Sequence, residues 1–440
     1  MSELLRTFIS LVVTTVTAIV PVILLLLLPW WALLAVLFVF TLWIGLTRTG
    51  TRVWSVTKVG LASIPGRLGS SSVIVVGIAG VVGVLVALLA MAQGFDATLR
   101  GTGAADTAII TRVGSQTEVN SILDRQSVDI VSQAPQVLRN ARGEPIASAE
   151  LVVINSILKK SNGLDANVEL RGIGERGWEL RPRAKIIAGR PFKPGLREMV
   201  VGSGVVEKFV GLDVDSVLTL NGQPWRIVGV FDTDDAQSSE LWADASVVAS
   251  VYSRDTSVAS LTVRLLDPTA FDAFKAHLAA DPRLKISVAT TRDFYGRQSQ
   301  TQTRLIRSVG LAIGIIMAIG AAFGALNTMY SAVVTRSREI ATLRAVGFQG
   351  FVVVVSILIE TAALALLGGV IGACASWLIF HGYTASTLGA NFSQVVFAFD
   401  VSTELLLSGL KWAFALGIVG GLFPALYAAR MPVTQGLRGL

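Results

Sequence analysis

Long stretches without charge limit what this chain can fold into. Charge and histidine are absent from residues 7–47, 68–95, 308–335 and 412–429, and residues 351–380 contain a single charged residue, Glu360. A helix needs about 20 consecutive apolar residues to cross the hydrocarbon core of a bilayer. Each stretch is about that long or longer, so the sequence predicts an integral membrane protein.

The composition agrees with a membrane protein and narrows the chemistry. Of the 440 residues, 15% are charged, whereas soluble proteins carry about 25%. The formal net charge of +7 is typical of a nucleic-acid binder, a membrane-surface protein or a membrane protein with basic cytoplasmic ends. One cysteine, Cys374, excludes an intramolecular disulfide, and two histidines leave no realistic zinc site. We therefore expect no metal and no bound cofactor.

The first apolar stretch is too long for one span. Pro29-Trp30-Trp31 lies near its middle, where proline breaks the helix and tryptophan suits a membrane interface. We expect a hairpin that crosses at residues 7–28 and returns at 31–47. The alternative is a cleaved signal peptide, but the apolar stretch is much longer than a signal core. Residues 48–67 are basic without an acid, which is typical of a helix lying at the interface.

Residues 93–307 differ from the apolar stretches, because they contain charged residues throughout and their apolar runs are only as long as a β-strand. Val217–Leu220 and Trp225–Phe231 flank an Asn221-Gly222 turn and predict a β-hairpin. Residues 293–307 contain no proline and continue into the next apolar stretch. A helix over residues 291–335 would be about 65 Å long and would extend beyond the bilayer as a stalk. A solvated linker is the alternative.

The expected fold is an α-helical membrane protein with six spans, in which an N-terminal hairpin precedes a core of four, and with an inserted α+β extracytoplasmic domain. The predicted parts are residues 1–47 (transmembrane hairpin), 48–69 (interfacial helix), 70–93 (first core span), 94–307 (α+β domain and stalk), 308–335 (second core span), 336–350 (cytoplasmic helix), 351–380 (third core span), 381–404 (outer loop) and 405–440 (fourth core span and tail).

Orientation follows from the positive-inside rule. With six spans, one side carries just two acids, Glu3 and Glu339, against the basic residues Arg6, Arg48, Arg52, Lys58, Arg67, Arg336, Arg338, Arg344, Arg430 and Arg438. We therefore expect both termini in the cytoplasm and the large domain outside it. The positive charge is then an orientation signal, and no nucleic acid is expected as a partner.

Catalytic motifs are lacking in the sequence. No Gly-Lys dipeptide occurs, so a Walker-type phosphate loop is absent. Gly202-Ser203-Gly204 lacks the Gly-x-Ser-x-Gly frame of a nucleophile elbow. We expect no enzymatic activity on this sequence.

The most informative segment is Arg336–Gly347. As a helix it places Ile340, Leu343 and Val346 on one face, and Gly347 suits a C-terminal cap. Arg336, Glu339 and Arg344 supply charge. Periodicity alone favours an interfacial segment with ordinary flanking charges.

This segment resembles the cytoplasmic signature of FtsX-like/MacB-like ABC transporter permeases. The matching residues are Arg338-Glu339-Ile340, Leu343–Gly347, Leu326–Met329, Ile359-Glu360, Gly368–Gly372 and Phe423–Arg438, where Gly436 replaces a preferred alanine, together with Leu170–Gly174, Ala188–Phe192 and Val228–Val230 in the inserted domain. The resemblance covers residues 53–440. The N-terminal hairpin departs from it, because the family core has four spans.

The resemblance implies a location in the bacterial cytoplasmic membrane and a dimer, most simply a homodimer. It implies two copies of a separate ABC ATPase, which would bind ATP and Mg, and an envelope partner such as a membrane-fusion protein, with membrane lipid around the spans. Under it, a coupling helix docks the ATPase through Ile340, Leu343 and Val346. The complete expected set is Arg336, Arg338, Glu339, Ile340, Leu343, Arg344, Val346 and Gly347.

Two further groups of residues lie within the apolar stretches. Glu360 and Asn327 fall at similar depth, and we expect a hydrogen bond between them to act as a packing latch; a proton relay is the alternative for an intramembrane acid. Gly368, Gly369 and Gly372 suit close helix contact, with a dimer interface as one location.

The expected function is that of a permease subunit of an ABC exporter or mechanotransmission complex. ATP hydrolysis on the partner would drive motion of the extracytoplasmic domain. The substrate classes left open are envelope lipids or lipoproteins, and small amphiphiles such as antibiotics or peptides. The alternative is a transmembrane signalling regulator of an envelope enzyme, for example a cell-wall hydrolase, that moves no substrate.

Overall fold

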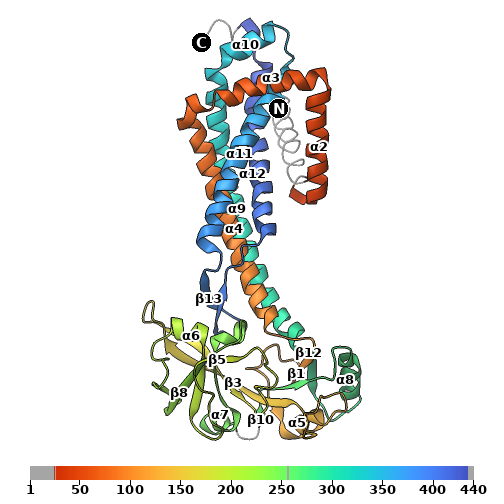
Figure 1. Ribbon diagram of the computed structural model, residues 1–440, viewed down its shortest axis with the longest axis vertical. Coiled ribbons are helices and arrows are strands. Elements are labelled where there is room, and N and C mark those ends of the chain that lie inside the picture. The colour runs from red at the N-terminus through yellow and green to blue at the C-terminus, as the bar shows by residue number, and fades with distance from the viewer. Residues whose placement is uncertain (1–23, 25, 255–256, 435–440) are drawn as a thin grey trace, which may run out of the picture. The chain divides into compact units, whose positions relative to one another are not determined.

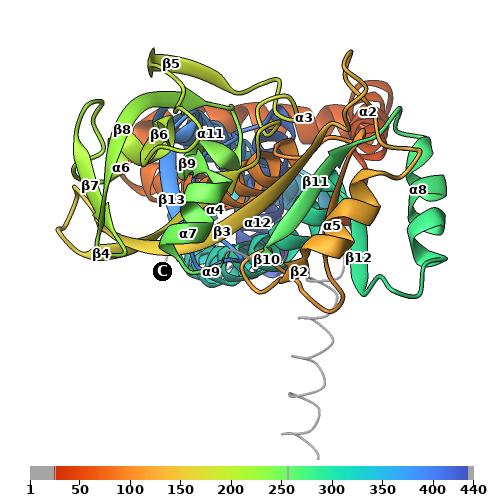
Figure 2. The same ribbon diagram turned by 90° about the horizontal axis from the view of Figure 1, so that it is seen from below.

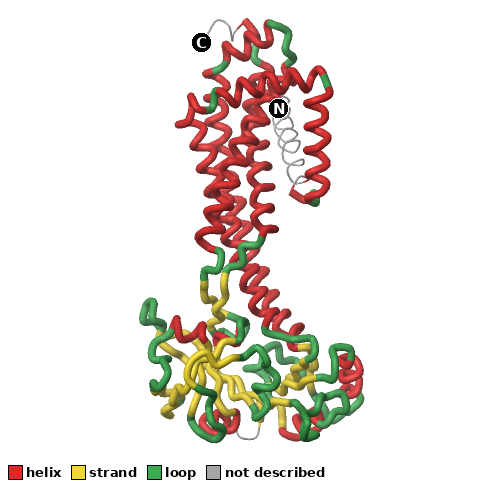
Figure 3. Tube along the Cα trace, viewed as in Figure 1, coloured by secondary structure: helices red, strands yellow, loops and turns green. Residues whose placement is uncertain are grey.

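The computed structural model describes residues 24, 26–254 and 257–434. The chain divides into two compact units (Figure 1). The helical unit comprises residues 1–90, 307–381 and 400–440, and the sheet unit comprises residues 91–306 and 382–399. Every strand in the described part of the chain lies in the sheet unit, as the yellow segments of Figure 3 show.

The helical unit is built from long apolar helices and shorter connecting ones. Its elements are α2 (Trp30–Leu46), α3 (Arg48–Ala62), η1 (Pro65–Arg67), the first part of α4 (Leu68–Gly101), the second part of α9 (Thr291–Thr335), α10 (Ser337–Ala345), α11 (Gly350–Phe380) and α12 (Thr403–Arg430). The continuous helix expected over residues 291–335 is confirmed by α9.

In the described part of the chain, four helices, α4, α9, α11 and α12, are long and apolar enough to cross a membrane. The bent pair α2 and α3 turns by 95° and counts as at most one further span. The six expected spans are therefore not confirmed, and most of the first arm of the predicted hairpin, residues 7–23, lies outside the described residues. Pro29 precedes α2, because a proline ring fits the N-terminus of a helix but not its interior.

The N-terminal segment is attached to the helical unit at both ends of α2. At one end, the Trp43 ring contacts the Phe351 ring edge-on, with centroids 6.2 Å apart. At the other end, Lys411 of α12 donates from Nζ to the Leu28 carbonyl oxygen at 2.7 Å and lies 4.5 Å from the centroid of the Trp30 ring. Lys411 therefore contacts the chain itself.

The sheet unit contains a ten-stranded sheet with the order β12-β1-β11-β3-β4-β9-β6-β8-β5, in which β7 pairs with β8. Figure 2 shows the long strand β3 between β11 on one side and β4 on the other. The strands are β1 (Thr107–Arg112), β2 (Leu123–Asp124), β3 (Ala147–Leu158), β4 (Asp165–Ile173), β5 (Lys185–Gly189), β6 (Glu198–Gly202), β7 (Val217–Leu220), β8 (Gln223–Asp232), β9 (Glu240–Asp244), β10 (Ser257–Val258), β11 (Ser260–Arg264) and β12 (Ile286–Thr290).

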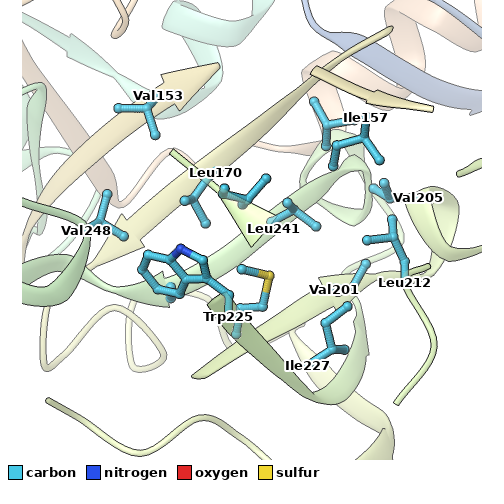
Figure 4. Packing of buried hydrophobic residues seen from close by; sticks show 14 of the residues in the cluster. Val153, Ile157, Leu170, Val201, Val205, Leu212, Trp225, Ile227, Leu241 and Val248 are labelled. Atoms are coloured by element: carbon cyan, nitrogen blue, oxygen red, sulfur yellow. The ribbon is translucent and has the colours of Figure 1, made fainter. Parts of the chain in front are cut away.

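Short helices cover the sheet, and two apolar clusters stabilise it. The helices are α5 (Arg125–Ser132), α6 (Ser203–Lys208), η2 (Ala236–Ser239), α7 (Ala245–Val251) and α8 (Ala270–Ala279). One cluster surrounds the fully buried Trp225 and includes Leu170 and Leu241 (Figure 4). The other surrounds Phe274 of α8 beneath β1 and β11.

The hairpin predicted from Asn221-Gly222 is confirmed. β7 and β8 pair in antiparallel register from Leu220 and Gln223 outward. Asn221 has φ +48° and Gly222 has φ +69°, the left-handed backbone that a two-residue hairpin turn requires.

A second hairpin joins the sheet unit from a distant part of the sequence. It comprises β13 (Thr384–Leu388) and β14 (Gln394–Ala398), between α11 and α12 in the chain. Its Phe397 ring contacts the Phe95 ring edge-on, with centroids 5.5 Å apart, in a cluster with Leu99 and Ala236. We call residues 384–398 the outer hairpin.

Candidate functional site

Helix α10 is short because defined local structures end it on both sides. Arg336, with φ −98° and ψ 14°, separates it from α9. At its C-terminus, Phe348 N donates to Leu343 O and Gly347 N donates to Arg344 O, both at 3.1 Å. Gly347 has φ +105°. These bonds form a Schellman cap, which needs a left-handed residue, and the predicted role of Gly347 is confirmed.

The apolar face of α10 is turned largely toward the protein, which corrects the expectation that Ile340 docks a partner. Ile340 is buried, and Leu343 packs against a cluster containing Val53, Val56 and Val352. An apolar stripe buries against the nearest apolar surface, which α3 and α11 provide here. Val346 alone of the three expected docking residues is well exposed, at 76%.

The opposite side of α10 is open. Its exposed residues are Arg338, Thr342, Ala345 and Val346, whose spacing places them on one side of the helix. We call these four residues the exposed α10 face. Glu339 is also exposed and pairs with Arg336, with Nε and Oε2 3.1 Å apart.

Arg344 does not lie on the exposed α10 face. Its side chain is partly buried, and Nη1 donates to the carbonyl oxygen of Met431, the residue that follows α12. The expected contact of Arg344 with a partner stays a prediction. The guanidinium ties α10 to the end of α12.

Glu360 of α11 is the buried centre of the site. Its side chain is 5% exposed, and its two oxygens contact two guanidinium groups: Arg67 Nη2 lies 2.9 Å from Oε1 and Arg336 Nη1 lies 3.1 Å from Oε2. A buried carboxylate is tolerated when it is paired and hydrogen-bonded. We call Arg67, Arg336 and Glu360 the charge triad. It joins the start of α4, the start of α10 and the middle of α11.

The expected pair of Asn327 and Glu360 is wrong, because Asn327 is exposed and the Glu360 oxygens contact arginines. Counting residues gives depth along each helix but not the direction in which a side chain projects. Sequence reasoning did not select Arg67 as a site residue. Arg67 is the last basic residue before an apolar stretch, and this position was the one sequence feature that could have indicated a role at the site.

A cavity of about 350 Å³ adjoins the charge triad. Apolar side chains of α3, α9, α10 and α11 line most of it, among them Val56, Met329 and Leu343. The cavity is partly open to the outside, so α10 borders a region where side chains have room to rearrange. Among the described residues, no group of three or more His, Cys, Asp or Glu side chains is placed to hold a metal ion.

The three glycines predicted to pack helices lie at contacts within the chain. A Cβ at Gly368 would be 2.6 Å from the Val75 carbonyl oxygen, and one at Gly372 would clash with the Ala79 carbonyl oxygen, both on α4. A Cβ at Gly369 would be 2.5 Å from Ala413 Cβ of α12. The described contacts of these glycines are therefore with α4 and α12 of the same chain, and a dimer interface is not needed to explain them.

These features define a class of protein: a multi-pass membrane protein with an inserted mixed α and β domain and a short helix held between its spans. Comparison with known families specifies the class. Residues 71–281 match the model described as the MacB-like periplasmic core domain, and residues 311–433 match the model described as the FtsX-like permease C-terminal region. The chain belongs to the FtsX-like/MacB-like ABC transporter permease family, which confirms the resemblance seen in the sequence.

Individual relatives are distant. The chain is 26% identical over 314 residues to a probable syringafactin export ATP-binding/permease protein of Pseudomonas syringae pv. tomato, covering 66% of this chain and 45% of that protein. It is 25% identical over 309 residues to the macrolide export ATP-binding/permease protein MacB of Vibrio parahaemolyticus, covering 64% and 44%. The chain thus spans about half the length of the curated relatives it matches.

Among solved structures, the periplasmic region of MacB from Actinobacillus actinomycetemcomitans matches 46% of this chain and 96% of its own length. The two are 16% identical, with a TM-score of 0.34.

Proposed function

We propose that the chain is the permease subunit of an ABC exporter or mechanotransmission complex, in which ATP hydrolysis on a separate ATPase moves an extracytoplasmic domain. One observation carries this proposal. Helix α10 is fixed to the spans at several points and still presents an exposed face. A helix arranged in this way can receive force from a partner and pass it to the spans.

The contacts of Arg336 and Arg344 define which helices would move with α10. Arg336 passes force to Glu360 of α11, and Glu360 passes it to Arg67 beside α4. Arg344 passes it to the end of α12 through the Met431 carbonyl. Two of the helices reached from this site, α4 and α9, are continuous over Leu68–Gly101 and Thr291–Thr335. Continuous helices resist bending unless a proline or bulge interrupts them, so they suit transmission along their length.

The exposed α10 face is the proposed ATPase contact. It combines one cation, Arg338, with the apolar Ala345 and the well-exposed Val346. Contacts of this kind use a desolvated apolar centre for affinity and a charge at the rim for orientation.

The proposed complex contains two copies of this chain and two ATPase subunits, which bind ATP and Mg, in a bacterial inner membrane. We also propose six spans, cytoplasmic termini and an extracytoplasmic sheet unit, because this arrangement places the basic residues of the short connecting segments on one side of the membrane. The sheet unit would bind an envelope partner such as a membrane-fusion protein. Relatives named for syringafactin export and macrolide export support an amphiphilic cargo, with lipids, lipoproteins and peptides as the substrate classes.

The test compares two substitutions on the exposed α10 face with one control substitution on α3. Tagged chain is purified from its native membranes, and co-purifying proteins are identified by mass spectrometry; we expect an ABC ATPase. Val346→Asp and Arg338→Glu should each abolish its recovery. Lys58→Glu, on the exposed side of α3, is the matched control and should retain it. Recovery of the ATPase with both α10 variants, or its absence from the wild-type sample, would contradict the proposal.

A second measurement separates export from regulation. The purified complex is reconstituted in vesicles, and ATP hydrolysis is measured together with efflux of amphiphilic dyes and release of lipid. ATP-dependent movement of cargo supports export. ATP hydrolysis without movement, together with a co-purifying cell-wall hydrolase, supports the signalling alternative.

A further inference from the structure

The centre of the sheet unit holds a buried group of ionisable side chains. Arg171 of β4 is about 1% exposed and lies within 3.0 Å of oxygens of Glu118, Glu150 and Glu240. Arg181 forms a second pair with Glu150 at 2.7 Å. The Arg171 cluster comprises Arg171, Arg181, Glu118, Glu150, Glu169 and Glu240. Two guanidinium groups face four carboxyl groups, so the cluster has too little positive charge to neutralise all of them.

Glu169 is the member with the weakest contact to a cation. Its Oε2 lies 3.8 Å from Arg171 Nη2, beyond hydrogen-bond distance. The other three carboxyl groups each accept hydrogen bonds from a guanidinium at 2.7 to 3.0 Å. Protonation of Glu169 would therefore disrupt no hydrogen bond to a guanidinium, whereas protonation of any of the other three carboxyl groups would weaken one. Glu169 is the carboxyl of the cluster best placed to carry a proton.

Glu169 is also where the outer hairpin is attached. Its Oε1 accepts hydrogen bonds from Asn391 Nδ2 and Ser393 Oγ, both at 2.7 Å. These donors lie in the turn between β13 and β14. The remaining polar attachments are weaker or neutral: Asn167 Nδ2 donates to Phe392 O at 3.0 Å, Lys159 Nζ to Gln394 Oε1 at 3.3 Å, and Val396 N to Ser239 Oγ at 2.9 Å. Glu169 is the ionisable acid in this contact.

A route for a proton is present next to the carboxyl. A cavity of about 30 Å³ is lined by Glu169, Glu240, Tyr295 and Asn391. A polar space of this size has room for a water molecule. Water there can carry a proton to Glu169 without the hairpin leaving its place.

The electrostatic surroundings favour the neutral carboxyl. Burial, and then the negative charge of Glu240, raise the pKa of Glu169 from 4.5 to about 7, against the opposing effects of Arg171, Ser393 and Asn391. Burial also opposes ionisation of Glu150, but Arg181 and Arg171 prevail and lower its pKa. Tyr295 of α9 also faces the cavity and contacts Glu118, with its hydroxyl 3.3 Å from Oε2.

We propose that Glu169 is a proton-binding site that controls attachment of the outer hairpin: the protonated carboxyl holds the hairpin against the sheet, and the ionised carboxyl releases it. The only covalent change is transfer of one proton between solvent and the carboxylate. Because the outer hairpin connects α11 to α12 in the chain, this site would make that connection sensitive to the acidity outside the cytoplasm.

The direction of the effect follows from proton linkage. The pKa of Glu169 is about 7 with the hairpin attached, and burial is the largest cause. Release of the hairpin exposes the carboxyl to water and removes part of that burial, so the pKa falls toward the usual range of a glutamate and the carboxyl takes up a proton on attachment. Attachment is then strongest at acidic pH, below the pKa of the released state, and is lost as the pH rises through 7. Between pH 6 and pH 8 the attachment equilibrium should fall by about tenfold.

The test is hydrogen–deuterium exchange of the full chain in lipid nanodiscs, read by mass spectrometry on peptides from residues 384–398. Rates are corrected for the intrinsic pH dependence of exchange. In the wild type, protection should fall about tenfold from pH 6 to pH 8. Glu169→Gln keeps an acceptor for Asn391 and Ser393 without a charge, so its protection should stay high and independent of pH.

Two further variants keep the test decisive. Glu169→Ala removes the acceptor and should lower protection at every pH. Lys159→Met removes the bond to Gln394 without changing an acid in the Arg171 cluster, so it should lower protection while leaving the pH dependence intact. Peptides from β3, which should not respond to pH, report that the sheet is folded. A flat wild-type profile, greater protection at high pH, or an unchanged pH dependence in Glu169→Gln would overturn the proposal.

Discussion

The charge triad leads to a specific stability prediction for Glu360→Gln. The carboxylate contacts Arg67 and Arg336, and all three side chains are at most 18% exposed. Removing one partner from a buried ion pair costs about 3 to 5 kcal/mol. Glutamine keeps one acceptor oxygen, so we expect the lower end, about 3 kcal/mol. For a unit of this size that corresponds to a decrease in Tm of about 6 to 12 °C.

The assay is thermal unfolding of purified chain in one detergent, followed by circular dichroism. Glu339→Gln is the matched control, because Glu339 contacts the same Arg336 but is 62% exposed; it should change stability by less than about 1 kcal/mol. Combining Glu360→Gln with Arg336→Gln should cost less than the sum of the two single changes, since the residues share one network. Equal Tm values for Glu360→Gln and Glu339→Gln would refute the assignment of the charge triad.

Two other predictions concern packing and acid stability. Gly372→Ala places a methyl group against the Ala79 carbonyl oxygen, whereas Gly77→Ala on α4 meets open space; the first should destabilise the chain by about 1 to 3 kcal/mol and the second should be neutral, which thermal unfolding would distinguish. In the sheet unit, hydrogen bonding to Arg190 holds the pKa of Glu198 at about 2, so the stability it contributes above about pH 4.5 should decrease as the pH falls through 2. Glu198→Gln should lose this acid sensitivity in exchange measurements on β6 peptides, and an unchanged acid response would count against the pair.

The sequence predicted those features that depend on neighbouring residues. Absence of charge located the long helices, Asn221-Gly222 located a hairpin, and uninterrupted helical sequence predicted α9 from Thr291 to Thr335. Gly347 was placed correctly because a left-handed cap strongly favours glycine.

The features that it missed depend on rotation and on distant segments. Spacing placed Ile340 and Leu343 on one face, but periodicity does not say which apolar surface that face meets. The same limit led to the wrong partner for Glu360. The Arg171 cluster combines residues from Glu118 to Glu240, and in the sequence each is an ordinary charge of a solvated domain. Only the sheet order, with β4 between β3 and β9, brings them together.

The contact between Lys411 and the Leu28 carbonyl has a consequence for shortened forms of this protein. A chain trimmed to begin at Arg48 would keep the four long apolar helices α4, α9, α11 and α12. Such a chain would leave the Lys411 ammonium without its oxygen acceptor and without the Trp30 ring, and an unpaired cation beside apolar helices is costly. Helix α12 is thus adapted to the segment that precedes Arg48, and trimming should be accompanied by an apolar replacement at Lys411. The segment from Leu28 to Leu46 is structurally integrated rather than appended.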